Sequence, residues 1–214
     1  MRNLIIYGGT FDPIHYGHIQ TAINVQNHFK FDKLIFLPCK IPVLKNQAIA
    51  TAAQRIQMLE LAIAPYVKQY NFALDLSEIN RETPSFMVDS LQHFRKQYGN
   101  ELAITLLMGE DTFNQLPRWH QWLELIHLSN ILVIHRAGFS ESLSEEMLKF
   151  LQKHETIDEF LLMEQAKGLI YRFDAGIFNF SSSWIRQHIQ SNKNLENYLP
   201  ESVIQFIKQY NLYS

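Results

Sequence analysis

The chain has 214 residues, of which 47% are hydrophobic and 19% are charged, and its formal net charge is −2. This composition suffices for one sizeable core, so we expect a single domain over residues 1–214. The near-neutral charge, without a basic stripe, argues against a nucleic-acid partner. Cys39 is the only cysteine, which excludes a disulfide framework and a thiolate metal site.

The beginning of the sequence runs from Met1-Arg2-Asn3 directly into an apolar segment. We find neither a signal peptide nor an apolar span long enough for a membrane helix. The expectation is a cytoplasmic protein that does not associate with membranes. The sequence leaves the oligomeric state open.

The first predicted strand, residues 4–7, leads through a glycine-rich turn into a helix. One face of this helix carries Ile19, Ala22, Ile23 and Gln26. Gly8 and Gly9 allow the turn to approach a ligand closely. The helix N-terminus offers N–H groups and a partial positive charge, so the pattern predicts a phosphate site.

Two histidines, His15 and His18, flank Gly17 at the start of this helix. Both imidazoles can donate a hydrogen bond to the same anion. They can also be incidental polar residues at a helix cap, or a pair of metal ligands. A metal pair lacks a third histidine or carboxylate at familiar spacing, so we predict an anion site without a protein-bound metal.

The run Gly8-Gly9-Thr10-Phe11-Asp12-Pro13, followed by His15-Tyr16-Gly17-His18, resembles the H-x-G-H signature of the nucleotidyltransferase superfamily. It is most similar to bacterial nicotinate-nucleotide adenylyltransferases, which join ATP to nicotinate mononucleotide. The resemblance implies an α/β fold, a Rossmann-like doubly wound parallel sheet with a small C-terminal helical part at about 181–214. It also implies ATP contacts from Gly8, Gly9, Thr10, Phe11, His15 and His18. The run fixes the superfamily and leaves the acceptor open.

A second strand at residues 33–38 completes a β-α-β unit with a parallel strand pair. The loop after it lies where ligands bind in open α/β sheets. The family's loop reads close to P-P-H-K. Here Pro42 and Lys45 fit, whereas Val43-Leu44 replaces the second proline and the histidine. Lys45, and less strongly Lys40, is therefore a candidate for triphosphate contact, with a solvated loop lysine as the alternative.

Residues 51–63 predict an amphipathic helix capped by Thr51, with an apolar face of Ala52, Ile56, Leu59 and Ile63. Arg55 resembles an arginine that the family carries near its active site. A third strand follows at residues 72–76.

The segment Thr83-Pro84-Ser85-Phe86 predicts a turn and a new helix, with Ser85 as its cap and Gly99 at its end. The family uses a similar segment beside the pyridine ring and its carboxylate. The resemblance therefore implies mononucleotide contacts from Thr83 and Ser85. Met87 stands where the family commonly has threonine.

The most hydrophobic strand, residues 102–108, is expected at the centre of the sheet. Gly109-Glu110-Asp111 follows and resembles the family's G-x-D, which implies ATP contacts from Gly109 and Asp111. Asp111 can bind a ribose hydroxyl or a metal-bound water. It can also cap a helix, and the two roles are compatible.

Two tryptophans stand close together in the next loop. We expect Trp122 to pack under a helix formed with Leu123 and Ile126, and Trp119 to stack on a flat ligand. Relatives carry P-x-W-[YHK] here, with the tryptophan against the nicotinate ring. In them, main-chain N–H groups near the position of His120 bind the nicotinate carboxylate.

A fifth strand is expected at residues 131–136. Arg136-Ala137-Gly138-Phe139 resembles the family's R-P-G-[YF], which assigns Arg136 to the mononucleotide. Residues 140–167 predict an acidic helical insertion that packs on the core. Short strands are expected at 170–173 and 177–180.

The second signature is Ser181-Ser182-Ser183-Trp184-Ile185-Arg186, at the start of a helix. It resembles the family's S-S-T-x-I-R, preceded here by phenylalanine in place of isoleucine. The resemblance assigns Ser181, Ser182, Ser183 and Arg186 to ATP, because hydroxyls, helix N–H groups and a guanidinium all bind phosphate. Plain helix capping by the serines is the alternative. Residues 200–210 predict a last helix that buries Val203, Phe206 and Ile207.

The predicted reaction is in-line attack of nicotinate mononucleotide on the α-phosphorus of ATP, in NAD biosynthesis. Its products are deamido-NAD and pyrophosphate. His15, His18, Lys45 and Arg186 are the expected catalytic residues, with Mg²⁺ carried by ATP. The alternatives are a pantetheine-phosphate adenylyltransferase, against which residues 83–85 and 117–119 argue, and a catalytically silent nucleotide-binding regulator. Intact histidines and Arg186 argue against the regulator.

Overall fold

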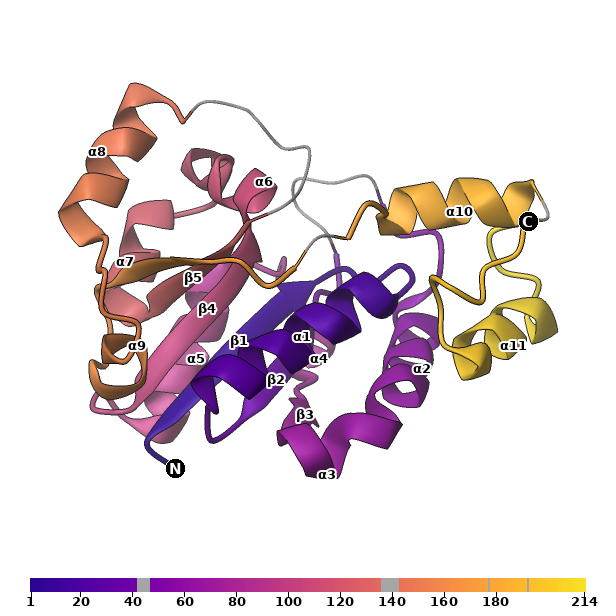
Figure 1. The fold of residues 1–214 in the computed structure, drawn as a ribbon, viewed down its shortest axis with the longest axis horizontal. Helices are drawn as coiled ribbons and strands as arrows, with labels where there is room; N and C mark the ends of the chain where they lie inside the picture. The colour runs from indigo at the N-terminus through magenta and orange to yellow at the C-terminus, as the bar shows by residue number, and fades with distance from the viewer. Residues whose placement is uncertain (42–46, 136–142, 177, 192) are drawn as a thin grey trace.

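The computed structural model describes residues 1–41, 47–135, 143–176, 178–191 and 193–214. Six strands form one parallel sheet in the order β3-β2-β1-β4-β5-β6. Helices cover both faces of the sheet (Figure 1). The chain builds outward from β1 in one direction and then from β4 in the other, which is the predicted doubly wound α/β arrangement. The strands are β1 Asn3–Gly9, β2 Leu34–Pro38, β3 Phe72–Leu74, β4 Ala103–Gly109, β5 Asn130–Ile134 and β6 Ile170–Phe173.

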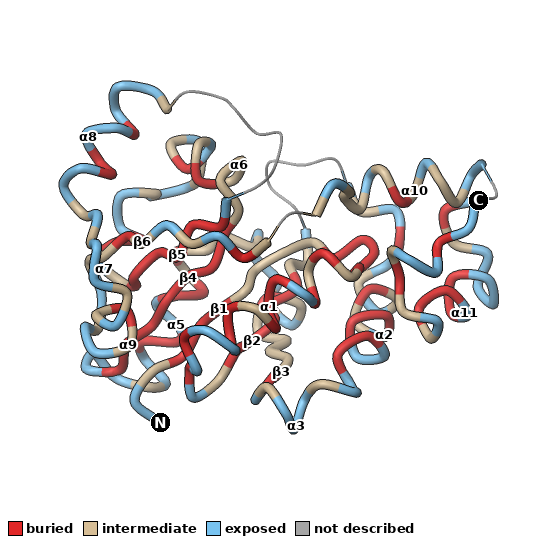
Figure 2. The backbone as a smooth tube through the Cα atoms, in the orientation of Figure 1, coloured by how far each residue is buried: buried red, intermediate tan, exposed pale blue. Residues whose placement is uncertain are grey.

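Two hydrophobic cores lie on opposite faces of the sheet because side chains alternate along each strand. On β1, Ile5 joins the core under α1 Tyr16–Phe29, α2 Ala52–Ile63 and α11 Glu201–Gln209. Leu4 and Ile6 join the core under α5 Met87–Tyr98, α7 Leu125–Leu128 and α8 Glu145–His154. Figure 2 shows the middle of the central strands buried, with exposed positions on the outer surfaces of the helices.

The remaining helices are short, apart from α10. They are α3 Val67–Tyr70, α4 Ser77–Asn80, α6 Glu110–Phe113, α9 Leu161–Glu164 and α10 Ser182–Gln190, with 3₁₀ turns at Ala64–Tyr66, Leu116–Arg118 and Trp122–Glu124. The helices α10 and α11 form the predicted C-terminal helical part, and α11 packs on α2 (Figure 1). Among the described helices, none is both long and apolar enough to cross a lipid bilayer.

Helix α2 begins as predicted but turns a different face inward. Thr51 caps it, since its hydroxyl accepts the Gln54 N–H while the Gln54 side chain accepts the Thr51 N–H. Its buried residues are Arg55, Met58, Leu59, Ala62 and Ile63, whereas the predicted Ala52 and Ile56 are only half-buried. The face is rotated because backbone carbonyls draw the Arg55 side chain into the interior.

Local expectations were wrong at four further places. Phe86, not Ser85, is the residue before α5, and it makes no side-chain cap; the Ser85 hydroxyl instead accepts the N–H of Lys40. Residues 178–180 form no strand, and β5 ends at Ile134. Trp122 begins a 3₁₀ turn, and its ring packs edge-on against Phe150 of α8.

Other local expectations were confirmed. Gly99 ends α5 with φ 86°, a conformation that favours glycine. Helix α11 buries Val203, Phe206 and Ile207, and α1 buries the four residues expected of it. The described part of the acidic segment contains α8 and α9, which pack on the two cores.

Arg95 of α5 joins several elements through backbone carbonyls. Its side chain is 7% exposed. The guanidinium donates to the carbonyl oxygens of Leu128 at 2.8 Å, Leu102 at 2.7 Å and Ala166 at 2.7 Å. A planar group with five N–H donors suits this arrangement, because it reaches carbonyls in several directions at once.

Replacing Arg95 with leucine should lower the free energy of unfolding by about 3 kcal/mol or more, because several buried carbonyls lose their donors. Lysine at position 95 should restore little of this loss, since an ammonium cannot reproduce the fork. Urea unfolding followed by circular dichroism measures both. Lys96→Leu, at the exposed neighbouring position, is the control; an equal loss there would contradict the role of the Arg95 hydrogen bonds.

Candidate active site

The loop after β1 folds back over the end of its own strand. Phe11 has φ 49°, an uncommon conformation for a bulky residue. Its ring is 2% exposed and packs against Phe36 and His18. A Cβ atom at Gly9 would lie 2.9 Å from the Phe11 ring, so only glycine leaves room for this turn.

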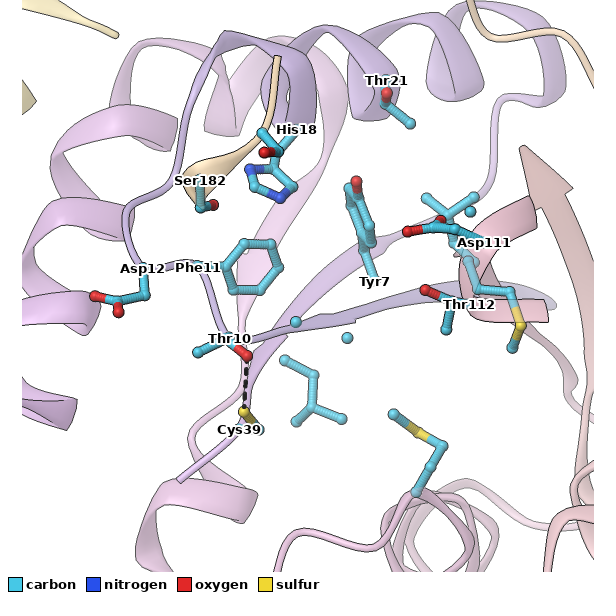
Figure 3. A pocket seen from close by; sticks show the side chains of 18 of the residues that line it. Tyr7, Thr10, Phe11, Asp12, His18, Thr21, Cys39, Asp111, Thr112 and Ser182 are labelled. Atoms are coloured by element: carbon cyan, nitrogen blue, oxygen red, sulfur yellow. Dashed lines mark hydrogen bonds between the residues drawn. The ribbon is translucent and has the colours of Figure 1, made fainter. Parts of the chain in front are cut away.

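The two predicted histidines stack on each other at the start of α1. Their ring centroids are 3.7 Å apart, with an angle of 29° between the planes. His15 is the residue before the helix and is 2% exposed. A Cβ atom at Gly17 would lie 3.0 Å from the His15 ring, which explains why glycine separates the histidines. The His18 ring also lies against Phe11, as Figure 3 shows.

Both imidazoles line a cavity of about 780 Å³ at the carboxyl ends of the strands. This volume suits a small-molecule ligand. In Figure 3, His18 and Ser182 lie on one side of Tyr7 and Asp111 and Thr112 on the other. Most of the predicted site residues line this cavity, namely Gly8, Gly9, Thr10, Phe11, His15, His18, Ser85, Gly109, Asp111, Trp119, His120, Ser181, Ser182, Ser183 and Arg186.

Four candidate residues are not placed at the cavity. Thr83 is exposed and does not line it. Lys45 and Arg136 lie outside the described residues, as do Pro42, Val43 and Leu44. The ammonium of Lys40 donates to the carbonyl oxygen of Arg81 at 2.8 Å, and Lys40 does not line the cavity.

The start of α10 docks directly on the loop after β1. Arg186 donates from Nη1 to the carbonyl oxygen of Asp12 at 2.7 Å and from Nη2 to Ser183 Oγ at 3.1 Å. Ser182 Oγ donates to the carbonyl oxygen of Pro13 at 2.9 Å. Ser181 caps the helix by accepting the Trp184 N–H. The capping alternative is therefore confirmed for Ser181, and the contacts place Arg186 and a helix N-terminus beside the histidine pair.

Arg55 fixes the loops after β1 and β2 from inside the protein. Its side chain is 1% exposed. The guanidinium donates to the carbonyl oxygens of Thr10 at 2.7 Å, Cys39 at 2.8 Å and Lys40 at 3.1 Å. The resemblance placed Arg55 near the active site, and the geometry gives it a positioning role there.

One wall of the cavity is aromatic. Trp119 is half-buried, lines the cavity and packs on the core beneath it. The exposed His120 ring lies 4.4 Å from the Phe86 ring, at 33° to it. This wall offers flat apolar surfaces to a ring-shaped ligand.

Glu78 also lines the cavity and was not anticipated. It is 2% exposed and accepts a hydrogen bond from Ser90 Oγ at 2.6 Å. Burial raises the pKa of Glu78, and hydrogen bonds from Ser90 and Ser85 partly oppose that shift. Glu78 sits in a four-residue helix without a recognisable motif, so the sequence carries no signal for it.

Asp111 lines the cavity from the end of β4. It stands in the first turn of α6, while Gly109 is the residue before that helix. Asp111 is therefore not the cap, although a carboxylate in a first helical turn is favourable. Next to it, Glu110 pairs with His135 at 3.0 Å. Within the described ranges, no cluster of three or more His, Cys, Asp or Glu side chains could hold a metal ion.

Comparisons with known proteins agree with this geometry. A cytidylyltransferase-like family profile matches residues 6–188. A Legionella pneumophila (strain Corby) protein named "Probable nicotinate-nucleotide adenylyltransferase" is 39% identical over 214 residues, covering 100% of both chains. A Methylococcus capsulatus protein of the same name is 35% identical and covers 98% of each chain.

Among solved structures, the fold is similar to that of Plasmodium falciparum nicotinic acid mononucleotide adenylyltransferase complexed with NaAD. The TM-score is 0.74 at 21% identity, over 100% of this chain and 98% of the other. The matched profile spans most of the chain. The Legionella and Methylococcus relatives align with 100% and 98% of the chain. The chain therefore belongs to the nicotinate-nucleotide adenylyltransferases, within the wider cytidylyltransferase-like family.

Proposed function

We propose that the protein transfers AMP from ATP to nicotinate mononucleotide, giving deamido-NAD and pyrophosphate, as a step of NAD biosynthesis. The observation that carries this proposal is one cavity whose lining combines imidazole and guanidinium donors with a tryptophan ring. The stacked His15–His18 pair, Arg186 and Trp119 all line it. The names of the full-length relatives support the same activity. A cytoplasmic location stays a prediction.

The reaction requires the protein mainly to position the two substrates and to stabilise negative charge. The 5′-phosphate of the mononucleotide is already a nucleophile at neutral pH and attacks the α-phosphorus of ATP in line with the departing pyrophosphate. The imidazoles of His15 and His18 donate to the phosphates as negative charge shifts to the leaving group. Arg186 and the N-terminus of α10 add positive potential, and Lys45 is proposed to act on the triphosphate. Holding both phosphates in one cavity supplies the orientation.

Mg²⁺ is proposed to enter the site bound to ATP, as part of the substrate. Asp111 presents one carboxylate to the cavity. Mg²⁺ bound to phosphates keeps several waters and uses one or two carboxylates at most, which fits this set of residues. When bound, the ion neutralises part of the triphosphate charge. Asp111 is proposed to face a ribose hydroxyl or one of the ion's waters.

For the acceptor, Trp119 is proposed to stack on the pyridine ring, and main-chain N–H groups near His120 to bind its carboxylate. A carboxylate accepts at both oxygens, whereas an amide would turn an NH₂ group toward a donor. Ser85 stands at the same wall. The exposed Thr83 is not proposed as a ligand contact here, and the role of Arg136 stays a prediction.

Pyrophosphate release from ATP tests the function. Nicotinate mononucleotide, nicotinamide mononucleotide and phosphopantetheine are compared as acceptors under identical conditions. We expect the highest kcat/KM with the first. Equal values for acid and amide would overturn the assignment to nicotinate, turnover with phosphopantetheine would favour that alternative, and no turnover with any acceptor would favour the silent regulator.

His18→Ala should lower kcat on the order of 10²-fold, with little change in the KM for nicotinate mononucleotide, because a donor to the transition state is lost. Steady-state kinetics give both values. His93→Ala, at an exposed position of α5, is the matched control. A His18 variant that keeps more than half of the wild-type kcat would contradict the catalytic role.

Trp119→Ala should raise the KM for nicotinate mononucleotide about tenfold and leave the KM for ATP nearly unchanged. Stacking contributes about 1 kcal/mol beyond area burial, and lost burial adds the rest. Trp122→Ala removes a tryptophan that packs on Phe150 and does not line the cavity, so it controls for general loosening. If the two variants gave the same kinetics, Trp119 would be a core residue.

A further inference from the structure

The carboxylate of Asp12 is almost completely buried beside the proposed ATP site. It is 4% exposed and belongs to the loop between β1 and α1. Oδ2 accepts the N–H of Ile49 at 2.8 Å, and Oδ1 accepts the N–H of Ala50 at 3.2 Å. A buried carboxylate is costly unless its oxygens are hydrogen-bonded, so these partners hold Asp12 in one orientation.

A third donor comes from the other end of the fold. Tyr213, which follows α11, is 4% exposed, and its hydroxyl donates to Asp12 Oδ1 at 2.7 Å. Burial, followed by the Asp12 carboxylate, raises the pKa of Tyr213, so its phenol stays protonated and remains a donor. This hydrogen bond joins residues 201 positions apart in the sequence.

The backbone around Tyr213 is shaped to make this contact. Asn211 has φ 49° and Tyr213 has φ 66°. An aromatic residue in the left-handed region is unfavourable and persists only where its surroundings impose it. Here the buried ring and the hydroxyl bond to Asp12 are the contacts that offset this cost.

Asp12 is connected to two parts of the cavity lining, namely Arg186 and the segment that contains Gln47 and Ala48. Its carbonyl oxygen accepts from Arg186, and its Oδ2 lies 4.0 Å from Arg186 Nη1. Through Ile49 it also fixes the segment containing Gln47 and Ala48, which line the cavity. The orientation of one carboxylate thus sets the positions of a cavity wall and of the guanidinium assigned to ATP.

We propose that Tyr213 is a positioning residue for ATP: its hydroxyl orients Asp12, which in turn holds Arg186 and the segment 47–50 against the nucleotide. The inference rests on the proposed function for the identity of the nucleotide. It goes beyond that function because it gives Tyr213 a selective effect on one of the two substrates. Tyr213 lies 27 positions after Arg186 and outside both sequence signatures.

The test uses Tyr213→Phe, which removes only the hydroxyl. Calorimetric titration with a non-hydrolysable ATP analogue should show a dissociation constant raised about fivefold or more, as expected when a buried carboxylate loses a donor. The dissociation constant for nicotinate mononucleotide should stay within about twofold of wild type. In an Arg186→Ala background, Tyr213→Phe should cause a smaller loss of analogue affinity than in the wild type, because part of its effect acts through Arg186 and only the segment 47–50 is left.

A second readout does not depend on catalysis. Amide hydrogen exchange at Ile49 and Ala50 should become at least about threefold faster in Tyr213→Phe, while amides of β4 keep their wild-type rates. Tyr210→Phe is the matched control, because the Tyr210 ring is 49% exposed and packs on Phe206. It should change neither exchange nor affinity.

Wild-type analogue affinity in Tyr213→Phe would overturn the proposal, and so would equal losses for both ligands, which would indicate a general packing defect. Unchanged exchange at Ile49 and Ala50 would also overturn it. The pyrophosphate-release assay detects failure of the proposed function separately, because the wild type would then release no pyrophosphate. The exchange comparison still decides the role of Tyr213 in that case.

Discussion

The buried guanidinium of Arg55 is the interaction on which the site depends most directly. It bonds to carbonyl oxygens at the ends of β1 and β2, and so sets the distance between the loops that follow the two strands. Removing a positive charge from water is costly unless the charge is well hydrogen-bonded. The loops therefore cannot separate without exposing either the carbonyls or the charge. The strained turn at Phe11 and the stacked histidines follow directly after Thr10, whose carbonyl oxygen Arg55 holds in place.

The site also shows how a chain with a net charge of −2 can bind two anionic substrates. Local field, not total charge, governs the cavity. The starts of α1 and α10 both lie at its edge, and Arg186 joins them through the Asp12 carbonyl. Hydrogen bonds within the protein hold these groups in place, so little reorganisation is needed when phosphate charge enters.

Sequence reasoning succeeded where the signal was local. The strand, glycine turn and helix of residues 4–26 lie next to one another in the chain, and their hydrophobic spacing predicts both the β-α-β unit and the site beside it. It failed where distant partners decide the outcome. The inward turn of Arg55 depends on carbonyls 15 to 45 residues away, and the hydroxyl of Ser85 bonds to a backbone N–H 45 residues away instead of capping α5. The Tyr213–Asp12 bond has no local pattern at all, because two residues 201 apart carry no shared periodicity.

The contact between Ser182 and Pro13 spans 169 residues, and it joins the two signatures of the proposed ATP site. During synthesis at roughly 5–20 residues per second, the histidine loop therefore waits on the order of ten seconds or more for its partner to leave the ribosome. In that interval β1, α1 and β2 can form from nearby sequence, but the histidine pair lacks the helix start and guanidinium that complete its surroundings. Assembly of the site is thus a late event in the life of the nascent chain, and a translational pause before α10 would prolong the interval in which the site is incomplete.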